Sequence, residues 1–379
     1  MHGTVAAGYE GVREEFAKVV AGERDDYAGQ VVAYVRGELV VDLWSGPEFT
    51  ADTLTGVFSC TKGAASLVVA LLVQDGVLDP DQRVSHYWPE FAAEGKQDIT
   101  LREVLAHRAG VVGADAGFSL AELADDRLIA ARMAGQRPYW RPGTAFGYHA
   151  WVIGALAGEV VRRTTGRSIQ ELFEERVRAP HGLDFYLGLP EDLEPRFATT
   201  LPMLPTPEQQ AEIDAEVTTA ESLAGIAFNE HRPDAPELWD FPNQRIARAQ
   251  GQASAGGVAS ARGLAGMYAA AVTGLNGRSP LLKPDTMAEF AQIQSIGNDV
   301  VSGTHKAFGL GFSVVTEFYP FLGQGAFGHS GAAGGLALAD PRSGLAYGYN
   351  RRRYAYPGGA AEENDALLLA CVTAARATR

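Results

Sequence analysis

The chain has 379 residues, 46% of them hydrophobic, and is therefore long enough for two domains or for one domain with a large insertion. Its formal net charge of −14 argues against nucleic acid and anionic membranes as partners, because both require a basic face. Two cysteines are too few for a disulfide framework, which favours a reducing cytoplasm. No secretory signal and no apolar run of membrane-spanning length are visible, so we expect a cytoplasmic protein.

The N-terminal part of the chain predicts a helix, a hairpin and a junction between a strand and a helix. Residues 7–21 carry apolar side chains on one face and end at a glycine, which is typical of an amphipathic helix. Two apolar runs, 30–35 and 39–44, flank a glycine-containing turn and predict a hairpin. A short strand at 55–58 then leads into 64–74, which is apolar nearly all round and predicts a buried helix.

The middle of the chain is predicted to be mostly helical. Residues 78–190 contain helical patterns broken by turns, and Thr100 and Glu103 there form a capping-box pair. Eight prolines interrupt the segment 190–250, which we predict to be long and irregular; such loops are usually functional lids or linkers. Helical patterns resume after it, at 260–273 and 284–293.

The C-terminal part predicts strands at 308–315, 335–339 and 344–350, followed by a helix at 360–376. Strands at both ends of the chain, with helices between them, indicate one sheet built from the two termini. We therefore expect a discontinuous α/β domain formed by 1–77 and 300–379. Residues 78–299 would form a helical insertion that includes the proline-rich segment.

Ser59 and Lys62 are the first candidates for a catalytic site. They are three residues apart at a predicted helix start, so their side chains share one face of the first turn. The helix N-terminus favours developing anions, and a lysine whose pKa is lowered by burial could take the proton of the serine. The pattern has only two fixed positions and also arises by chance, so an ordinary surface lysine is the competing interpretation.

Two further segments could complete such a site. Tyr148 lies on a turn just before a predicted helix, where its phenol could handle a proton or simply pack under the helix. His329 lies in a glycine-rich stretch, 328–335, which could let backbone approach a ligand or could be a plain turn between strands. The backbone N–H of Ala332 and that of Ser59 would then form an oxyanion hole.

Other reactive residue types receive less support. Ser330 nearly matches the nucleophile-elbow motif, but the last glycine and the required following helix are missing. Cys60 would point about a quarter-turn away from Ser59 and is interpreted as a buried packing residue. No metal-ligand spacing, dinucleotide fingerprint or Walker-type loop is present, so we expect no metal and no cofactor.

Several short motifs occur in an order that carries a family resemblance. They are residues 58–63, 74–81, 99–110, 141–143 before Tyr148, 254–257, 308–311 and 328–331. With them the chain resembles the class C-like branch of the serine β-lactamase and penicillin-binding superfamily, and most of all the family VIII carboxylesterases. The resemblance implies a three-layer α+β fold of the β-lactamase type, with helices flanking an antiparallel sheet and a mostly helical inserted domain.

The resemblance also implies roles for individual residues. Ser59 would be the acylated nucleophile and Lys62 and Tyr148 the proton-handling pair, with the N–H groups of Ser59 and Ala332 as oxyanion hole. Penicillin-handling members have Asn where this chain has Ala150. They also have Lys-Thr-Gly where it has the substrate-binding candidates His329, Ser330 and Gly331. A neutral imidazole is a poorer partner than an ammonium group for a β-lactam carboxylate, which favours esters as substrates.

The sequence therefore predicts a serine carboxylesterase that hydrolyses short-chain acyl esters through an acyl-Ser59 intermediate. Trp239 and Phe241 could line its acyl pocket, or could be ordinary loop aromatics. An acyltransferase of the same fold, a weak β-lactamase or amidase, and a non-enzymatic penicillin-binding-like module are the alternatives. The natural substrate and the oligomeric state are left open.

Overall fold

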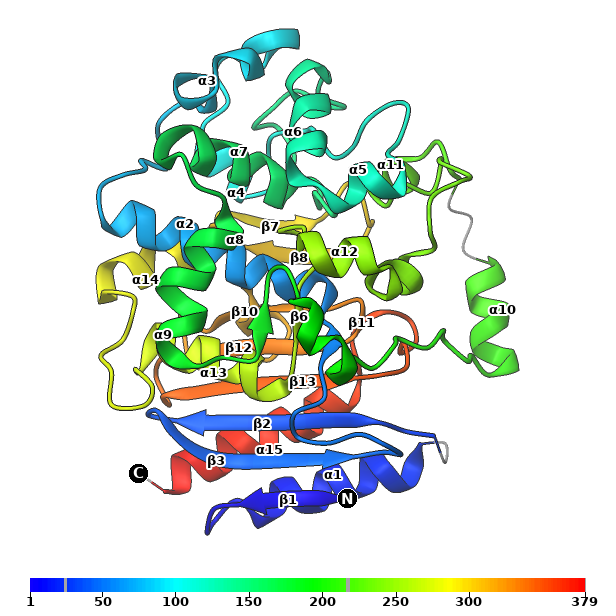
Figure 1. Cartoon of the computed structure of the whole chain (residues 1–379), viewed down its shortest axis with the longest axis vertical. Helices are drawn as coiled ribbons and strands as arrows, with labels where there is room; N and C mark the ends of the chain where they lie inside the picture. The colour runs from blue at the N-terminus through cyan, green and yellow to red at the C-terminus, as the bar shows by residue number, and fades with distance from the viewer. Residues whose placement is uncertain (24–25, 216–218, 379) are drawn as a thin grey trace.

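The computed structural model describes residues 1–23, 26–215 and 219–378, and its central element is a nine-stranded antiparallel sheet (Figure 1). Strands from both ends of the chain meet in this sheet, because β2 pairs with β13 over seven residues of each strand. The predicted single sheet from the two termini is thus confirmed. In order across the sheet, the strands are β1 (His2–Val5), β3 (Glu38–Ser45), β2 (Gly29–Val35), β13 (Leu345–Arg351), β12 (Leu336–Asp340), β10 (Phe327–Ser330), β9 (Ser313–Val314), β8 (His305–Phe308) and β7 (Ser295–Asn298).

Helices cover both faces of the sheet and give the molecule three layers in this region. Along β2, Val31 packs in the same cluster as residues of α1 (Glu10–Gly22) and α15 (Glu363–Ala377). The next residue, Val32, packs against α13 (Ala261–Val272), because successive strand side chains point to opposite faces. Figure 1 shows α13 on one side of the sheet and α1 and α15 on the other. The predicted three-layer α+β fold is confirmed.

Glycines at two positions explain local features of this sheet. The predicted hairpin turns at Arg36 (φ 51°) and Gly37 (φ 84°), and a two-residue turn with positive φ at both positions matches the twist of the flanking strands. A Cβ at Gly348 of β13 would lie 2.7 Å from backbone atoms of Ala261 and Ala265, so glycine there lets α13 approach the sheet closely.

Some of the remaining helices are drawn above the sheet in Figure 1 and others beside it, and α2 (Thr61–Gln74) runs below the upper ones. The capping box of Thr100 and Glu103 is present at the start of α4. The remaining helices are α3 (Val84–Tyr87), α4 (Leu101–Leu105), α5 (Leu120–Ala124), α6 (Asp126–Gly135), α7 (Ile153–Thr165), α8 (Ile169–Phe173), α9 (Ala179–His181), α10 (Pro207–Ala215), α11 (Leu223–Ala227), α12 (Arg245–Gln250) and α14 (Pro284–Ala291). The small sheets are β4 (Thr55–Gly56), β6 (Val258–Ala259) and β5 (Phe185–Tyr186), and β11 (Ala333–Gly334) with β14 (Gly359–Ala360).

Some predicted elements differ from the observed ones. The expected strand at 308–315 is interrupted, because Gly311 takes φ 77° and turns the chain between β8 and β9. The proline-rich segment 190–250 is not irregular throughout, since it contains α10, α11 and α12. Within the expected insertion 78–299, β7 joins the sheet and α13 packs on it, so these two elements lie with the sheet rather than with the other helices. The division of the chain into two units stays a prediction.

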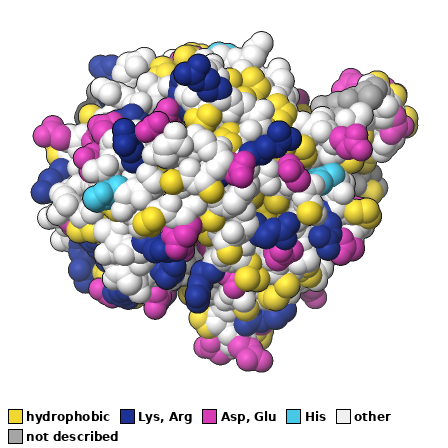
Figure 2. Space-filling model, turned by 90° about the horizontal axis from the view of Figure 1, so that it is seen from above, with side chains coloured by type: hydrophobic (Ala, Val, Ile, Leu, Met, Phe, Trp, Pro, Cys, Tyr) yellow, Lys and Arg dark blue, Asp and Glu magenta, His cyan; other side chains and the backbone are white. Residues whose placement is uncertain are grey.

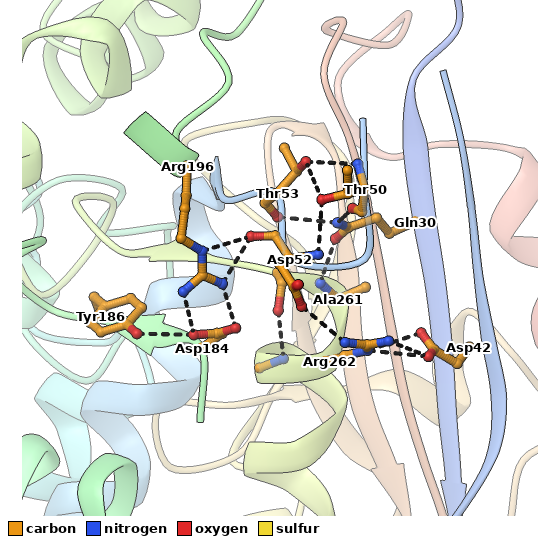
Figure 3. A network of polar contacts seen from close by, with 12 residues as sticks. Gln30, Asp42, Thr50, Asp52, Thr53, Asp184, Tyr186, Arg196, Ala261 and Arg262 are labelled. Atoms are coloured by element: carbon orange, nitrogen blue, oxygen red, sulfur yellow. Dashed lines mark hydrogen bonds and ion pairs between the residues drawn. The ribbon is translucent and has the colours of Figure 1, made fainter. Parts of the chain in front are cut away.

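A polar network holds the segment that leads into β4 and the serine beyond it (Figure 3). Gln30 on β2 donates to the carbonyl of Thr53 at 3.1 Å and accepts the first N–H of α13 at 2.8 Å. Arg262 on α13 donates to the carboxylate of Asp52 at 3.0 Å, and Arg196 donates to the Asp52 carbonyl at 2.8 Å. Strands, helix and loop are thereby tied together just before the candidate nucleophile.

The surface gives no sign of a single-signed charge patch on the face seen in Figure 2, where acidic and basic side chains are interspersed. Among the described residues, no helix is both long enough and apolar enough to cross a membrane.

Candidate active site

Ser59 lies in a tight turn between β4 and α2. The short 3₁₀ helix η1 (Phe58–Cys60) leads directly into α2, and Phe58 takes φ 46°, a left-handed conformation that is costly for a bulky residue. Strand β10 packs against this turn, and directly after the strand a Cβ at Gly331 would lie 2.5 Å from the Val57 carbonyl. Cys60 is buried and donates to the His329 carbonyl, which confirms its interpretation as a packing residue.

Lys62 is buried at the first turn of α2 and has three hydrogen-bond partners. Its Nζ lies 3.0 Å from Ser59 Oγ, 2.7 Å from the Ala150 carbonyl and 3.0 Å from the Ser254 carbonyl. Burial lowers the pKa of Lys62 to about 7, which makes the neutral amine accessible near neutral pH. A neutral amine has two N–H groups and one lone pair, so the two carbonyls can occupy both donors while the lone pair faces the serine.

Tyr148 donates its phenol proton to Ser59 Oγ at 2.7 Å. Its ring stacks on Phe308 at 5.9 Å between centroids, and Lys62 Nζ lies 4.9 Å from the ring centroid. Burial raises the pKa of Tyr148 above its ordinary value, so the phenol stays protonated. The two groups thus differ: Lys62 can accept a proton near neutral pH, whereas Tyr148 can donate one.

Comparisons with known proteins identify the family of this chain. The family model described as Beta-lactamase matches residues 16–371 of the chain. The chain belongs to the beta-lactamase family. Within the superfamily, the predicted resemblance to family VIII carboxylesterases is also confirmed by the solved structures below.

The similar proteins include esterases. The esterase/beta-lactamase LipL of Mycobacterium tuberculosis is 29% identical over 373 residues, which cover 90% of this chain and 80% of LipL. The structure of EstA from Arthrobacter nitroguajacolicus superposes with a TM-score of 0.92 at 43% identity, over 100% of both chains. A family VIII carboxylesterase gives a TM-score of 0.87 at 32% identity, covering 98% of this chain and 99% of its own.

In this member of the beta-lactamase family, β10 brings the glycine-rich stretch beside the serine. Neither Ser59 N–H nor Ala332 N–H donates any of the backbone hydrogen bonds found outside regular elements in the described part of the chain. The Ala332 carbonyl, in contrast, accepts the Gly359 N–H at 3.1 Å, which fixes the strand end. The arrangement is compatible with the predicted oxyanion hole, which stays a prediction.

His329 lies in β10 close to Tyr148, with 6.0 Å between their ring centroids. Its Nδ1 contacts the Ser330 carbonyl at 2.8 Å, and its buried Nε2 has no hydrogen-bond partner among the described residues. Burial, together with the charge of Lys62, lowers the pKa of His329 to about 3. A neutral imidazole therefore stands at this position, and the substrate-binding role of His329, Ser330 and Gly331 stays a prediction.

Both predicted pocket aromatics contact residues other than the catalytic candidates. Phe241 is fully buried, with its ring 4.7 Å from that of Trp151 between centroids, and the Trp239 indole donates to Glu237. In the described part of the chain, no hydrogen bond or ring contact joins either residue to Ser59, Lys62 or Tyr148. Their role as pocket walls stays a prediction.

Three residues beside the site were not singled out from the sequence. Phe228, which follows α11, lies 6.4 Å from Tyr148 between ring centroids. Ser254 supplies a carbonyl to Lys62, and His107 packs against the Tyr148 ring at 5.2 Å. Ser254 and His107 both fall within motifs that carried the family resemblance, whereas nothing in the sequence distinguished Phe228 from other loop aromatics.

A metal site is not apparent in the part of the chain that the structure describes. No group of three or more His, Cys, Asp or Glu side chains there is arranged to hold an ion. The chemistry below therefore uses only the chain's own groups.

Proposed function

We propose that this protein is a carboxylesterase that hydrolyses short-chain acyl esters through an acyl-enzyme on Ser59. The proposal rests on one observation: Ser59 Oγ lies within hydrogen-bond distance of Lys62 Nζ, at 3.0 Å, and accepts a hydrogen bond from the Tyr148 hydroxyl at 2.7 Å. The serine is thus held between a group that can take its proton and a group that can give one away.

The predicted class of enzyme, a serine hydrolase acting on carboxylic esters, is confirmed by similar proteins named as esterases. The acyl-serine intermediate, the chain length of the substrate and the residue roles belong to the proposal. We likewise expect a small ester as the partner, with neither nucleic acid nor membrane, and a cytoplasmic location.

The first half-reaction forms the acyl-enzyme. Neutral Lys62 takes the proton of Ser59, and Oγ attacks the ester carbonyl carbon as the carbonyl π pair moves to oxygen. The resulting oxyanion accepts hydrogen bonds from the N–H groups of Ser59 and Ala332. As the tetrahedral intermediate collapses, the C–O bond to the alcohol breaks and Tyr148 protonates the leaving alkoxide. Lys62 then returns the serine proton to Tyr148, so both groups regain their starting states.

The second half-reaction releases the acid. A water molecule loses a proton to the neutral Lys62 and attacks the acyl carbon, and the new oxyanion uses the same two N–H groups. The bond between the acyl carbon and Ser59 Oγ breaks, and the serine regains a proton through Lys62 or Tyr148. The neutral pair of groups needed for the next cycle is restored.

The choice of esters over β-lactams rests on two positions. Ala150 contributes only its carbonyl, which binds Lys62, so this position offers no side-chain amide to a lactam. His329 is neutral and offers no charge to the carboxylate that β-lactam antibiotics carry.

Labelling with a p-nitrophenyl phosphonate, followed by peptide mass spectrometry, tests the proposal. We expect one phosphonyl group on Ser59, with loss of esterase activity in proportion to labelling, and none in Ser59→Ala. Labelling on Ser330, or ester turnover that survives Ser59→Ala, would contradict it. Product analysis with added alcohol separates hydrolysis from acyl transfer.

A further inference from the structure

His107 holds the backbone on both sides of Tyr148. Its carbonyl accepts the Gly147 N–H at 3.0 Å, and its ring Nδ1 accepts the His149 N–H at 3.0 Å. Its ring also packs on the Tyr148 ring, with 5.2 Å between centroids. One buried residue therefore holds both neighbours of the tyrosine and also contacts its ring.

The conformation of His107 indicates that its side chain matters. It lies two residues beyond the end of α4 (Leu101–Leu105) and takes φ 60°, where a helix commonly ends with glycine. A residue with a Cβ is strained in this left-handed region, and such strain is concentrated at functional sites. Glycine here would keep the turn but would provide no acceptor for the His149 N–H.

The hydrogen bond to His149 requires a neutral imidazole with its proton on Nε2. Burial lowers the pKa of His107 well below its ordinary value, and the charges of His149, Lys62 and His329 lower it further. The Nε2 atom is buried and has no partner among the described residues. Nothing on the ring therefore competes with the role of Nδ1 as acceptor.

We propose that His107 is a positioning residue, which clamps the backbone around Tyr148 and so keeps the phenol on the Ser59 hydroxyl. This inference rests on the proposed role of Tyr148 as the donor of a proton to the leaving alkoxide. His107 does not touch the reacting atoms and acts through Tyr148. Loss of the clamp should therefore resemble loss of the phenol itself.

Three variants separate the effect of losing the acceptor for the His149 N–H from the effect of the left-handed backbone conformation. His107→Gly accepts the positive φ without strain and lacks the acceptor, and His107→Ala is a second variant without it. His107→Asn keeps an acceptor near the position of Nδ1 and tolerates the left-handed region. For ethyl esters we expect the first two to lower kcat by about 10- to 100-fold with little change in KM, and His107→Asn to regain most of it.

The leaving group provides a readout that a merely structural loss would not move. A p-nitrophenolate leaves without being protonated, whereas an ethoxide requires a proton. We expect the loss in His107→Gly to be about tenfold smaller for p-nitrophenyl esters than for ethyl esters, as for Tyr148→Phe. In the double variant with Tyr148→Phe, the two losses should not add, because both act on the same proton.

His181→Asn is the control, since His181 is also a buried histidine whose Nδ1 binds backbone, in its case the Val177 carbonyl, and it should keep wild-type kinetics. Any of three results would overturn the inference. The loss of kcat could be equal for ethyl and p-nitrophenyl esters, it could add to that of Tyr148→Phe, or folded His107→Gly and His107→Ala could keep the wild-type kcat. Turnover that survives Ser59→Ala would instead overturn the proposed function, so the two failures are distinguishable.

Discussion

Two lysines of this protein are buried in similar ways, at the start of α2 and at the end of the 3₁₀ segment η2 (Pro89–Gly95). Lys62 and Lys96 are both almost inaccessible, and burial lowers the pKa of each. Both ammonium groups also lie beside an aromatic ring. Each Nζ donates to two backbone carbonyls: those of Ala150 and Ser254 for Lys62, and those of Ala93 and Gln136 for Lys96.

The difference between them is the third partner. Lys62 Nζ also lies 3.0 Å from Ser59 Oγ, and the same oxygen accepts a hydrogen bond from the Tyr148 hydroxyl. In the part of the chain that the structure describes, Lys96 has no hydroxyl partner. Burial and two carbonyls are therefore not enough to identify a catalytic lysine. What distinguishes Lys62 is its third polar partner, the hydroxyl of the candidate nucleophile Ser59.

Replacing each lysine by methionine gives the largest expected contrast. Lys62→Met should lower kcat/KM for esters by about 10²- to 10⁴-fold, the range expected for loss of a general base. Lys96→Met should keep wild-type kinetics. Both should lower stability by about 1–3 kcal/mol, because two buried carbonyls lose their donors.

Initial rates with ethyl and p-nitrophenyl esters, together with urea unfolding, measure both effects. A large kinetic loss in Lys96→Met, or a near-normal rate in Lys62→Met, would remove the distinction between the two lysines.

The pair also shows what a single sequence can and cannot predict. Ser59, Lys62 and Tyr148 were singled out because hydroxyl, amine and phenol occur at helix starts, and the structure brings their polar atoms together. That Lys62 rather than Lys96 faces a serine depends on its three-residue spacing from Ser59, a local feature that sequence displays. The carbonyl of Ser254 depends on a chain segment nearly 200 residues away, which no local pattern reveals.

In the fold, too, features set by local patterns could be predicted and features set by distant contacts could not. The hairpin of β2 and β3 and the capping box of Thr100 were predictable, because a short-range pattern determines each. The interruption between β8 and β9 was not, because Gly311 accommodates a contact from a distant helix: a Cβ there would lie 2.2 Å from Ser66 Oγ. Phe228 was missed for the same reason, since α11 reaches Tyr148 only through tertiary packing.

The pH dependence of catalysis sharpens the assignment of Lys62 as the base. Only its neutral form can take a proton, and its pKa is lowered to about 7. We therefore expect kcat/KM to be constant above about pH 8 and to fall about tenfold per pH unit below about pH 6. The pKa of His329, at about 3, and that of His149, at about 4, are too low to produce this limb.

A partly buried carboxyl group also titrates close to this range. Burial raises the pKa of Asp126 to about 6, and its carboxylate accepts the Ala253 N–H next to the Ser254 that binds Lys62. The pH–rate profile of Asp126→Asn is therefore the control. If the fall of kcat/KM at low pH persists in this variant, the titrating group is Lys62. If the fall disappears, the titrating group is Asp126.

The smallest expected effect concerns the wall of the substrate pocket. Phe228 is held in place because its carbonyl accepts the Trp151 indole N–H at 3.1 Å, while the next residue, Asn229, clasps the backbone of Phe118 through both side-chain atoms. Its half-buried ring faces that of Tyr148. A rigid ring in this place should limit the size of the ester that reaches Ser59.

Phe228→Ala should therefore shift the preference toward longer substrates, by about fourfold in kcat/KM for each added methylene that the enlarged pocket can bury. A series of p-nitrophenyl esters varies the acyl chain, and a series of acetates varies the alcohol, so the two together show which portion the ring touches. Trp239→Ala is the matched comparison, because Trp239 has no contact with Tyr148 in the described part of the chain. A shift in Trp239→Ala with none in Phe228→Ala would place the wall at Trp239, as the sequence predicted, and would leave Phe228 as a packing residue for Tyr148.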